Sequence, residues 1–556
     1  YSLTPTFILD GVFGYTRFDQ SVLGPGSDKN WGLDVWKIPG TNGGQGKYID
    51  DPRYKGQPAL YTGFTVWGYE PTWFPLFRND RSYTYTHNFS KQRGAHEIRW
   101  GLDVIRHDLN HWQPEAGHPR GSITFSCNAT MIRGGTCRSI NQYASALMGL
   151  VGSYGKSVQF FDMKTREWQL GWYARDRWQV TRNLTLNLGL RYEYYPLIDR
   201  GDRGIERWDP ATNIVYFGGL GNTPRNAGIT VSKRLFAPRI GFAYRLGSKT
   251  VIRSGYGITI DPLPVGRPLR GLYPATIVGS WTAAETYGWY NNLSQGIPAV
   301  PLPDVSAGQL VLPSSLDMGP RSPWGGLMHR GYIQSWNFTV ERELPWNLVA
   351  SVGYVGNHTV HQFLDRDINA STTLGGGSRS RPLYATQGRT QTMSMWDGWA
   401  DAHYNALQVQ VNRSYRGLFL KTAYTWSKAM NYADDDGWQG VSYNHPAMLR
   451  RNYALAGYDR THGFVQSFVY DLPFGRGQKF NISNPVANHM FGGWQVNGLL
   501  SMYTGTPMMI SASTASLDMP GTPQTADIIG KAQKIGTVGP GTTFYDVSVF
   551  RDPNWD

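Results

Sequence analysis

The clearest regularity in the sequence is an alternation of apolar and polar side chains that begins at Leu184. One set is apolar or aromatic and consists of Leu184, Leu186, Leu188, Leu190, Tyr192 and Tyr194. The residues between them are polar or small and include Asn187, Arg191 and Glu193. Because successive side chains of a strand point to opposite sides, the pattern predicts a strand with one apolar and one polar face. Its length fits the roughly 9–11 residues of a tilted transmembrane strand. We therefore predict that the first set faces lipid and the second faces a lumen.

The same unit recurs along the chain as hairpins with short turns. A strand over 168–180 precedes the first one, and a second hairpin joins 239–245 to 250–260. In the latter, Ile252 and Ile258 fall on the predicted lipid face and Arg253 on the predicted lumen face. Two further hairpins turn at 345–347 and 415–417. Weaker strand candidates are 7–17, 83–89, 97–106, 464–472 and 494–503.

Long connections separate these hairpins and are rich in Gly, Pro, Asn and Ser. They cover 108–165, 196–233, 261–331, 364–403 and 431–459. Short turns at one end and long loops at the other are typical of an outer-membrane barrel, with periplasmic turns and extracellular loops. Structureless loops of this length would be unusual in a compact soluble domain. The sequence therefore predicts an all-β fold, a transmembrane antiparallel β-barrel with loops that are free to grow.

Several aromatic residues in the later hairpins allow two interpretations. Trp336, Tyr354, Tyr424 and Trp426 could stack on sugars or anchor the barrel at the membrane interface. We favour anchoring, because aromatic girdles flank the apolar band of such barrels.

Composition agrees with a barrel and argues against other membrane and disordered classes. Aromatic residues make up 14% of the chain, which is too many for a disordered segment. No apolar run approaches the roughly 18 residues of a membrane helix. Mean hydropathy is −0.41, as expected when only one face of each strand is apolar. The net charge is +13, but basic residues form no run, so we expect a solvated basic surface facing lipid phosphates and not a nucleic-acid site.

Candidate chemistry is sparse. Cys127 and Cys137 lie in a predicted loop and could form a disulfide in an oxidising compartment or remain free thiols. The metalloprotease pattern that could begin at His96 is incomplete. The phosphate-binding loop pattern around Lys156 is incomplete as well. Asp434-Asp435-Asp436 could hold Ca²⁺ but reads better as a solvated acidic turn. The tripeptide Arg200-Gly201-Asp202 has the sequence of an adhesion motif, but a chance occurrence explains it better. We therefore expect no catalytic residues, no metal, no cofactor and no enzymatic activity.

Several of the predicted hairpin segments resemble those of a known family. The hairpin segments Trp172–Thr181 and Leu184–Glu193 are similar to a signature of TonB-dependent receptors, and most similar to the Oar-like group. Further matching segments occur in the family's order between about Thr72 and Thr506: Phe236–Tyr244, Thr250–Gly257, Gln334–Asn337, Val352–His358, Tyr404–Gln408, Tyr424–Ala429 and Tyr470–Gly475.

The resemblance implies an outer-membrane barrel of about 22 strands around a plug, energised by an inner-membrane TonB complex. We find no plug, N-terminal regulatory domain, TonB box or signal peptide in the sequence. We count roughly 13 strand candidates, fewer than closure needs. We therefore expect residues 1–556 to be the barrel portion, incomplete at both ends.

Two functions follow from this interpretation. In the first, extracellular loops capture a ligand and a plug gates its import; oligosaccharide, peptide and siderophore remain open as ligands. In the second, the barrel is a surface platform for export, adhesion or assembly. A soluble β-rich enzyme is the third and weakest alternative, since it needs a cleft with paired carboxylates.

Overall fold

A computed structural model describes most of the chain. The described residues are 1–24, 26–68, 74–113, 118–262, 276–314, 322–415, 417–434, 441, 445–513 and 515–553.

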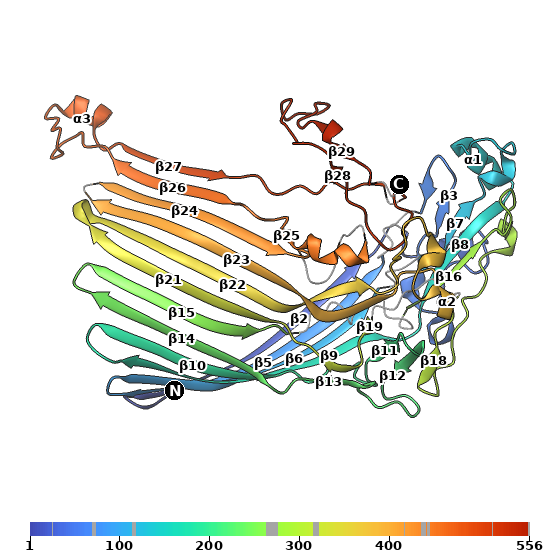
Figure 1. Cartoon of the computed structure of the whole chain (residues 1–556), viewed down its shortest axis with the longest axis horizontal. Coiled ribbons are helices and arrows are strands. Elements are labelled where there is room, and N and C mark those ends of the chain that lie inside the picture. The colour runs from blue at the N-terminus through green and yellow to red at the C-terminus, as the bar shows by residue number, and fades with distance from the viewer. Residues whose placement is uncertain are drawn as a thin grey trace.

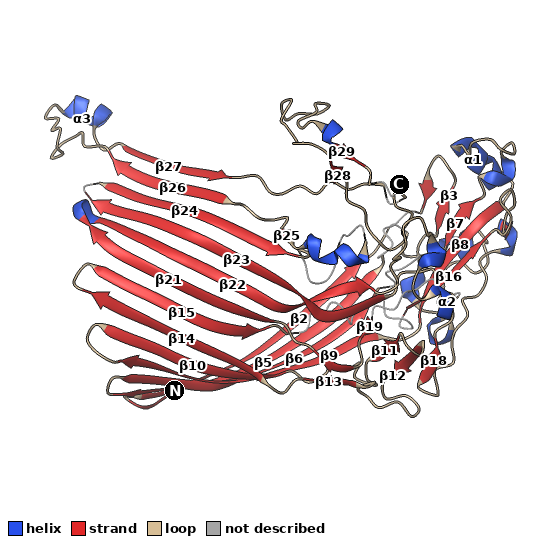
Figure 2. Cartoon of the chain, in the orientation of Figure 1, coloured by secondary structure: helices blue, strands red, loops and turns tan. Residues whose placement is uncertain are grey.

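One large sheet dominates these residues, and each of its long strands pairs antiparallel with the next long strand along the chain. Figure 1 shows the sheet curving as one continuous wall, with strands in red in Figure 2. The predicted antiparallel β architecture is confirmed. The short strand β1 (Ser2–Thr4) lies at one edge of the described pairings, and β27 (Gln495–Tyr503) lies at the other. The long strands are β2 (Phe7–Val22), β5 (Leu76–Arg93), β6 (His96–Trp112), β9 (Met163–Gln179), β10 (Leu184–Tyr194), β14 (Leu235–Leu246), β15 (Thr250–Ile260), β21 (Tyr332–Leu344), β22 (Leu348–Asp367), β23 (Ser394–Tyr415), β24 (Leu418–Asn431), β26 (His462–Asp471) and β27 (Gln495–Tyr503).

The strand register gathers apolar residues from many strands on one face. Leu184 pairs with Tyr244, and the row continues through Ile252, Val340, Val352, Val409, Tyr424, Phe464 and Met502. Because a slip of one residue would turn every side chain to the other face, an unbroken apolar row indicates a specified register. We call the side chains on this side the apolar face and those on the other side the polar face.

Short hairpin turns join the strands at one end of the sheet, as predicted. They include 181–183, 247–249 and 345–347 and lie at the left of Figure 1. In the last of these turns Trp346 and Asn347 have φ of 64° and 54°, the left-handed conformation that a tight turn between twisted strands requires.

The long connections are not structureless, so that expectation is wrong. The connection 108–165 contains β7 (Ser122–Phe125), α1 (Ser139–Leu147) and β8 (Leu150–Gln159). Together with β3 (Ala59–Tyr61), β4 (Val66–Trp67) and β16 (Thr276–Thr282), the strands β7 and β8 build a second sheet in the order β16-β8-β7-β3-β4. We call the parts of the connections at this end the cap, residues 26–68, 118–159, 196–233, 276–314, 322–329 and 368–393.

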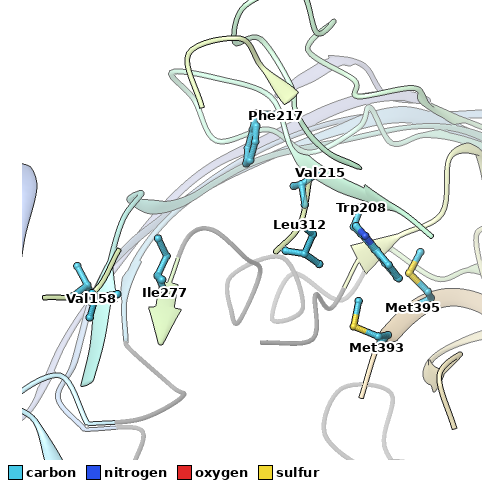
Figure 3. Close-up of a cluster of buried hydrophobic side chains, with 9 residues drawn as sticks. Val158, Trp208, Val215, Phe217, Ile277, Leu312, Met393 and Met395 are labelled. Atoms are coloured by element: carbon cyan, nitrogen blue, oxygen red, sulfur yellow. The ribbon is translucent and has the colours of Figure 1, made fainter. Parts of the chain in front are cut away.

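The cap has a hydrophobic core of its own, which explains why its chain is ordered. Val158, Trp208, Phe217, Ile277 and Met393 come from four different connections and are each at most 1% exposed. Figure 3 shows them with their neighbours across β8, β11 (Glu206–Asp209), β12 (Ile214–Phe217) and β16. Burying large apolar side chains at about 1.5–3 kcal/mol each offsets the entropy of ordering these connections.

Several strands continue into the cap beyond their predicted ends. β22 and β23 occupy 364–367 and 394–403, which were predicted as loop. Consecutive residues there are buried, including Phe363 with Leu364 and Met395 with Trp396. Both faces of these strand ends are covered by the cap, so the alternation that reveals a half-buried strand is missing.

Among the described residues, no helix has both the length and the apolar character required to cross a bilayer.

Candidate functional site

The polar face of the sheet carries a network of two neighbouring groups of hydrogen bonds, which together span five strands. Asn88 on β5 donates to the Asp10 carboxylate on β2 at 2.8 Å and accepts from the Tyr173 hydroxyl on β9 at 2.6 Å. Gly101 on β6 lies between Asn88 and Tyr173 in the register. A methyl group there would come within 3.0 Å of both side chains, so the glycine leaves the space that this hydrogen bond needs.

Arg191 is the centre of the next part of the network. Its Nη1 donates to Asp103 on β6 at 2.6 Å, and its Nε donates to Glu193 at 2.7 Å. To reach Asp103, the guanidinium passes over Gly171 on the intervening strand β9. Glu193 is 7% exposed, so its charge requires the partner that Arg191 provides.

A hollow of about 730 Å³ adjoins this network on the polar face. Its floor includes Gly189, Gly241, Gly255 and Gly257, which lie on the neighbouring strands β10, β14 and β15. The four arginines that line it are Arg99, Arg175, Arg191 and Arg239. Glycines without side chains therefore create a recess in the wall, and guanidinium groups surround it with hydrogen-bond donors.

The predicted lumen residues all lie on this polar face by register. Arg191 and Glu193 are in direct contact, and Asn187 lines the same hollow as Arg191. Arg253 lies apart from them on β15, where its Nη1 is 3.9 Å from Glu341. Asp103, Tyr173 and Asn88 were not among the predicted site residues, although the predicted strands 97–106, 168–180 and 83–89 contain them.

The predicted lipid-facing residues lie together on the apolar face. Leu188 and Leu190 are 41% and 50% exposed in the chain alone. Tyr192 belongs to an aromatic row, since its ring centroid is 5.9 Å from that of Trp172 and 5.0 Å from that of Phe236. Such a row has the character of an interfacial girdle.

The four predicted anchors share the apolar face but lie in the interior of their strands. The Trp336 ring covers Gly356, where a methyl group would overlap it. The Tyr354 hydroxyl donates to Asn405 at 2.5 Å, and the Tyr424 hydroxyl is 2.8 Å from His462 Nδ1. Trp426 is 55% exposed. Their role as anchors stays a prediction.

Other candidate motifs lie in the connections between the long strands. Cys127 and Cys137 are joined by a disulfide, with Cα atoms 5.8 Å apart. Lys156 is buried, and its Nζ donates to the carbonyls of Gly40 and Asn42 at 2.6 Å, so it holds chain segments together. Of the acidic run, Asp434 accepts from Asn431 and Gly457, while Asp435 and Asp436 lie outside the described residues. No group of three potential metal ligands occurs within the described part of the chain.

The Arg-Gly-Asp tripeptide does not present its arginine at the surface. Arg200 is 2% exposed and donates to Glu206 through Nε at 3.1 Å and Nη2 at 2.9 Å. Arg203 donates to the other Glu206 oxygen, and its guanidinium lies 4.0 Å above the Phe161 ring. Burial would raise the pKa of Glu206, but the two guanidinium groups outweigh it and lower the pKa to about 2. The three charges form a structural cluster inside the cap.

A comparison with known protein families decides the class of this chain. The family model described as outer membrane beta barrel domain matches residues 1–555. The chain belongs to this family. The polar and apolar faces described above are therefore the two faces of an outer-membrane barrel domain, and the outer membrane is its location.

The chain is also similar to several solved structures. They include the outer membrane transporter YddB from Escherichia coli, with 8% identity and a TM-score of 0.40. The match covers 90% of this chain and 60% of YddB. The siderophore receptor PirA from Acinetobacter baumannii has 9% identity and a TM-score of 0.39, and the match covers 84% of this chain and 46% of PirA. The pyoverdine receptor FpvA from Pseudomonas aeruginosa PAO1 has 12% identity and a TM-score of 0.37, and the match covers 79% of this chain and 44% of FpvA. This barrel domain thus spans about half the length of these proteins. No curated protein matches the sequence.

Proposed function

We propose that this barrel domain belongs to an Oar-like TonB-dependent receptor and imports a ligand across the outer membrane. The cap captures the ligand, a plug gates its passage, and the TonB complex supplies energy. The observation that carries this proposal is the polar face: charged side chains and glycines line the inner wall behind a continuous apolar face. A solvated inner wall offers a path that a ligand can follow through hydrocarbon.

The cap supports a role in capture. Its hydrophobic core holds several connections in one arrangement, and the disulfide and the Arg200–Glu206–Arg203 cluster each fix a segment within one connection. Binding to an ordered surface costs less conformational entropy than binding to free loops. The ligand classes consistent with such a receptor are oligosaccharide, peptide and siderophore.

A surface platform is the second candidate, and the outer tip of the cap favours it. Ile132, Leu147 and Met148 are 87%, 74% and 60% exposed near the disulfide and α1. Exposed apolar groups of this kind are common where proteins associate. A platform would need no energy from TonB.

Uptake measurements distinguish the two functions. Cells with and without the gene are given radiolabelled iron-loaded siderophore, maltodextrin or tripeptide, before and after an uncoupler collapses the proton gradient. Import predicts that uptake of one probe falls on gene deletion, returns on complementation and requires the gradient. If deletion alters surface attachment and leaves the uptake of every probe unchanged, the platform is favoured.

A further inference from the structure

One connection at the turn end of the barrel is long, in contrast to the short turns beside it. It joins β26 to β27 over residues 472–494 and contains the helix α3 (Pro485–Phe491). Asp471 and Gln495 pair at its base, and Figure 1 shows α3 beside the hairpin turns, at the opposite end from the cap. In a barrel of this family, that end faces the periplasm.

Internal hydrogen bonds fasten this connection. The Asn488 side chain accepts from the backbone N–H of Arg476 at 2.7 Å and so ties α3 to the first half of the connection. Asn484 caps α3 by accepting from Val486 and Ala487. The Trp494 indole donates to the carbonyl of Met490 at 2.8 Å. The segment is therefore a folded element and not a slack linker.

This folded element nevertheless presents its large apolar side chains outward. We call them the rim patch: Phe474, Phe480, Val486, Met490, Phe491 and Trp494, which are 41%, 50%, 70%, 58%, 59% and 61% exposed. Val486 and Met490 are four positions apart and so share a face of α3. The rings of Phe474 and Phe480 stack at 5.2 Å. Large apolar side chains fixed in an exposed position indicate a surface that is covered in the working protein.

The position of the rim patch favours lipid as its cover. On β26, Phe468 and Tyr470 lie on the same apolar face as Phe464, which pairs with Tyr424 of β24. The rim patch begins just beyond Tyr470 along the chain. The apolar face of an outer-membrane barrel ends at the lipid headgroups, where Trp and other amphipathic groups concentrate. The rim patch therefore continues the lipid-facing surface into the headgroup layer.

The charge of the connection complements a phospholipid surface. Arg476, Lys479 and His489 are exposed, and the sequence between Asp471 and Asp518 contains no acidic residue. The Lys479 ammonium lies 5.5 Å from the centre of the Phe480 ring, so cation and aromatic group are presented together. Basic residues beside inserted aromatic and aliphatic groups are the usual composition of an interfacial membrane anchor.

From these observations we infer that residues 472–494 form a membrane anchor at the periplasmic rim. The rim patch inserts among acyl chains at the headgroup boundary, while Arg476 and Lys479 contact anionic phospholipid phosphates. The occupant is the phospholipid leaflet, and a protein partner is the alternative outcome of the test.

Site-specific fluorescence tests the anchor in the complete protein. Both native cysteines are in the disulfide, so Val486→Cys introduces a single free thiol for an environment-sensitive dye. Ser248→Cys, exposed in the short turn after β14, is the matched control at the same end. Labelled protein is placed in nanodiscs of phosphatidylcholine alone, or with roughly one third phosphatidylglycerol. Iodide quenches dye in water, and a nitroxide on the lipid chain quenches dye in the bilayer.

The anchor predicts a blue-shifted dye at position 486 that iodide barely quenches and the lipid nitroxide quenches strongly, with the opposite pattern at 248. Phosphatidylglycerol should increase the lipid quenching, and the variant R476E/K479E should lose this increase. Iodide quenching at 486 equal to that at 248 would overturn the proposal. So would protection from both quenchers, which would indicate a protein cover, or lipid quenching that neither phosphatidylglycerol nor the charge reversal changes.

Discussion

The guanidinium of Arg191 lies directly over Gly171 of the neighbouring strand, in space that a methyl group would fill. This contact allows Arg191 to reach Asp103 two strands away, at 2.6 Å. A residue without a side chain thus permits a charge-assisted hydrogen bond across the wall of the barrel. The glycine content of the strands, which in a soluble sheet would only weaken packing, has a specific function here.

Gly171→Ala is expected to destabilise the barrel by about 1–3 kcal/mol, because the new methyl group displaces Arg191 from Asp103. Gly189→Ala is the matched control on β10, since its nearest neighbour would be at an ordinary 3.4 Å. The midpoint of urea unfolding in lipid, followed by tryptophan fluorescence, measures the difference. Equal midpoints for the two variants would show that the Arg191 contact does not matter for stability.

A lysine on the apolar face should cost far more than one on the polar face. Leu188→Lys is expected to destabilise the barrel by about 2–4 kcal/mol, the penalty for a basic side chain near the bilayer centre. Asn187→Lys, one residue earlier and on the opposite face, should cost much less, because its ammonium remains in water even with Arg177 opposite it in the register. Unfolding of both proteins in the same lipid measures the ratio, and similar losses would contradict the assignment of the faces.

The charge cluster in the cap predicts a dependence on pH. The pKa of Glu206 is about 2 in the folded protein against an ordinary value of 4.5. A lowered pKa contributes stability that is complete above pH 4.5 and is lost as the pH falls toward 2. Resistance of the cap to an acid-active protease should therefore decline over this interval.

Glu206→Gln tests the same cluster at neutral pH. It removes the carboxylate that the two buried guanidinium groups share and should destabilise the cap by about 3–5 kcal/mol. It should also remove the part of the acid dependence that belongs to Glu206. Glu285→Gln at an exposed position of the cap is the control. An unchanged acid profile in the Glu206 variant would mean that other carboxyl groups cause the decline.

Loss of the disulfide should loosen the tip of the cap and leave the barrel unchanged. The bridge closes a loop over a sequence separation of 10 residues, for which the chain-entropy model gives about 3 kcal/mol. Cys127→Ser with Cys137→Ser is expected to accelerate tryptic cleavage at Arg133, within that loop. Cleavage at Arg182 in a short turn serves as the internal standard. Equal acceleration at both sites would indicate global destabilisation.

The sequence predicted best the part of the fold that touches two different environments. The strand over Leu184–Tyr194 was located correctly because lipid on one side and water on the other impose strict alternation. The ends of β22 and β23 were taken for loop, because the cap buries Leu364 and Trp396 together with their sequence neighbours. Alternation fails wherever both faces of a strand have the same environment.

The candidate site could be predicted only in part for a related reason. The polar positions Asn187, Arg191 and Glu193 follow from alternation within one strand. The partners of Arg191 depend on register between strands that are distant in sequence, and Asp103 is two strands away. The hydrophobic core of the cap likewise joins four connections, and no local pattern indicates that Trp208 and Met393 meet.

A spin-label scan along β10 tests whether one face of the sheet contacts hydrocarbon and the other contacts water. A nitroxide is attached in turn at positions 184 to 192, and its collisions with oxygen, which concentrates in lipid, are compared with collisions with a water-soluble nickel chelate. We expect accessibility to alternate with a period of two, with oxygen favoured at Leu186, Leu188 and Leu190 and nickel favoured at Asn187 and Arg191. Accessibility to nickel at every position, or no alternation, would contradict the assignment of hydrocarbon to one face and water to the other.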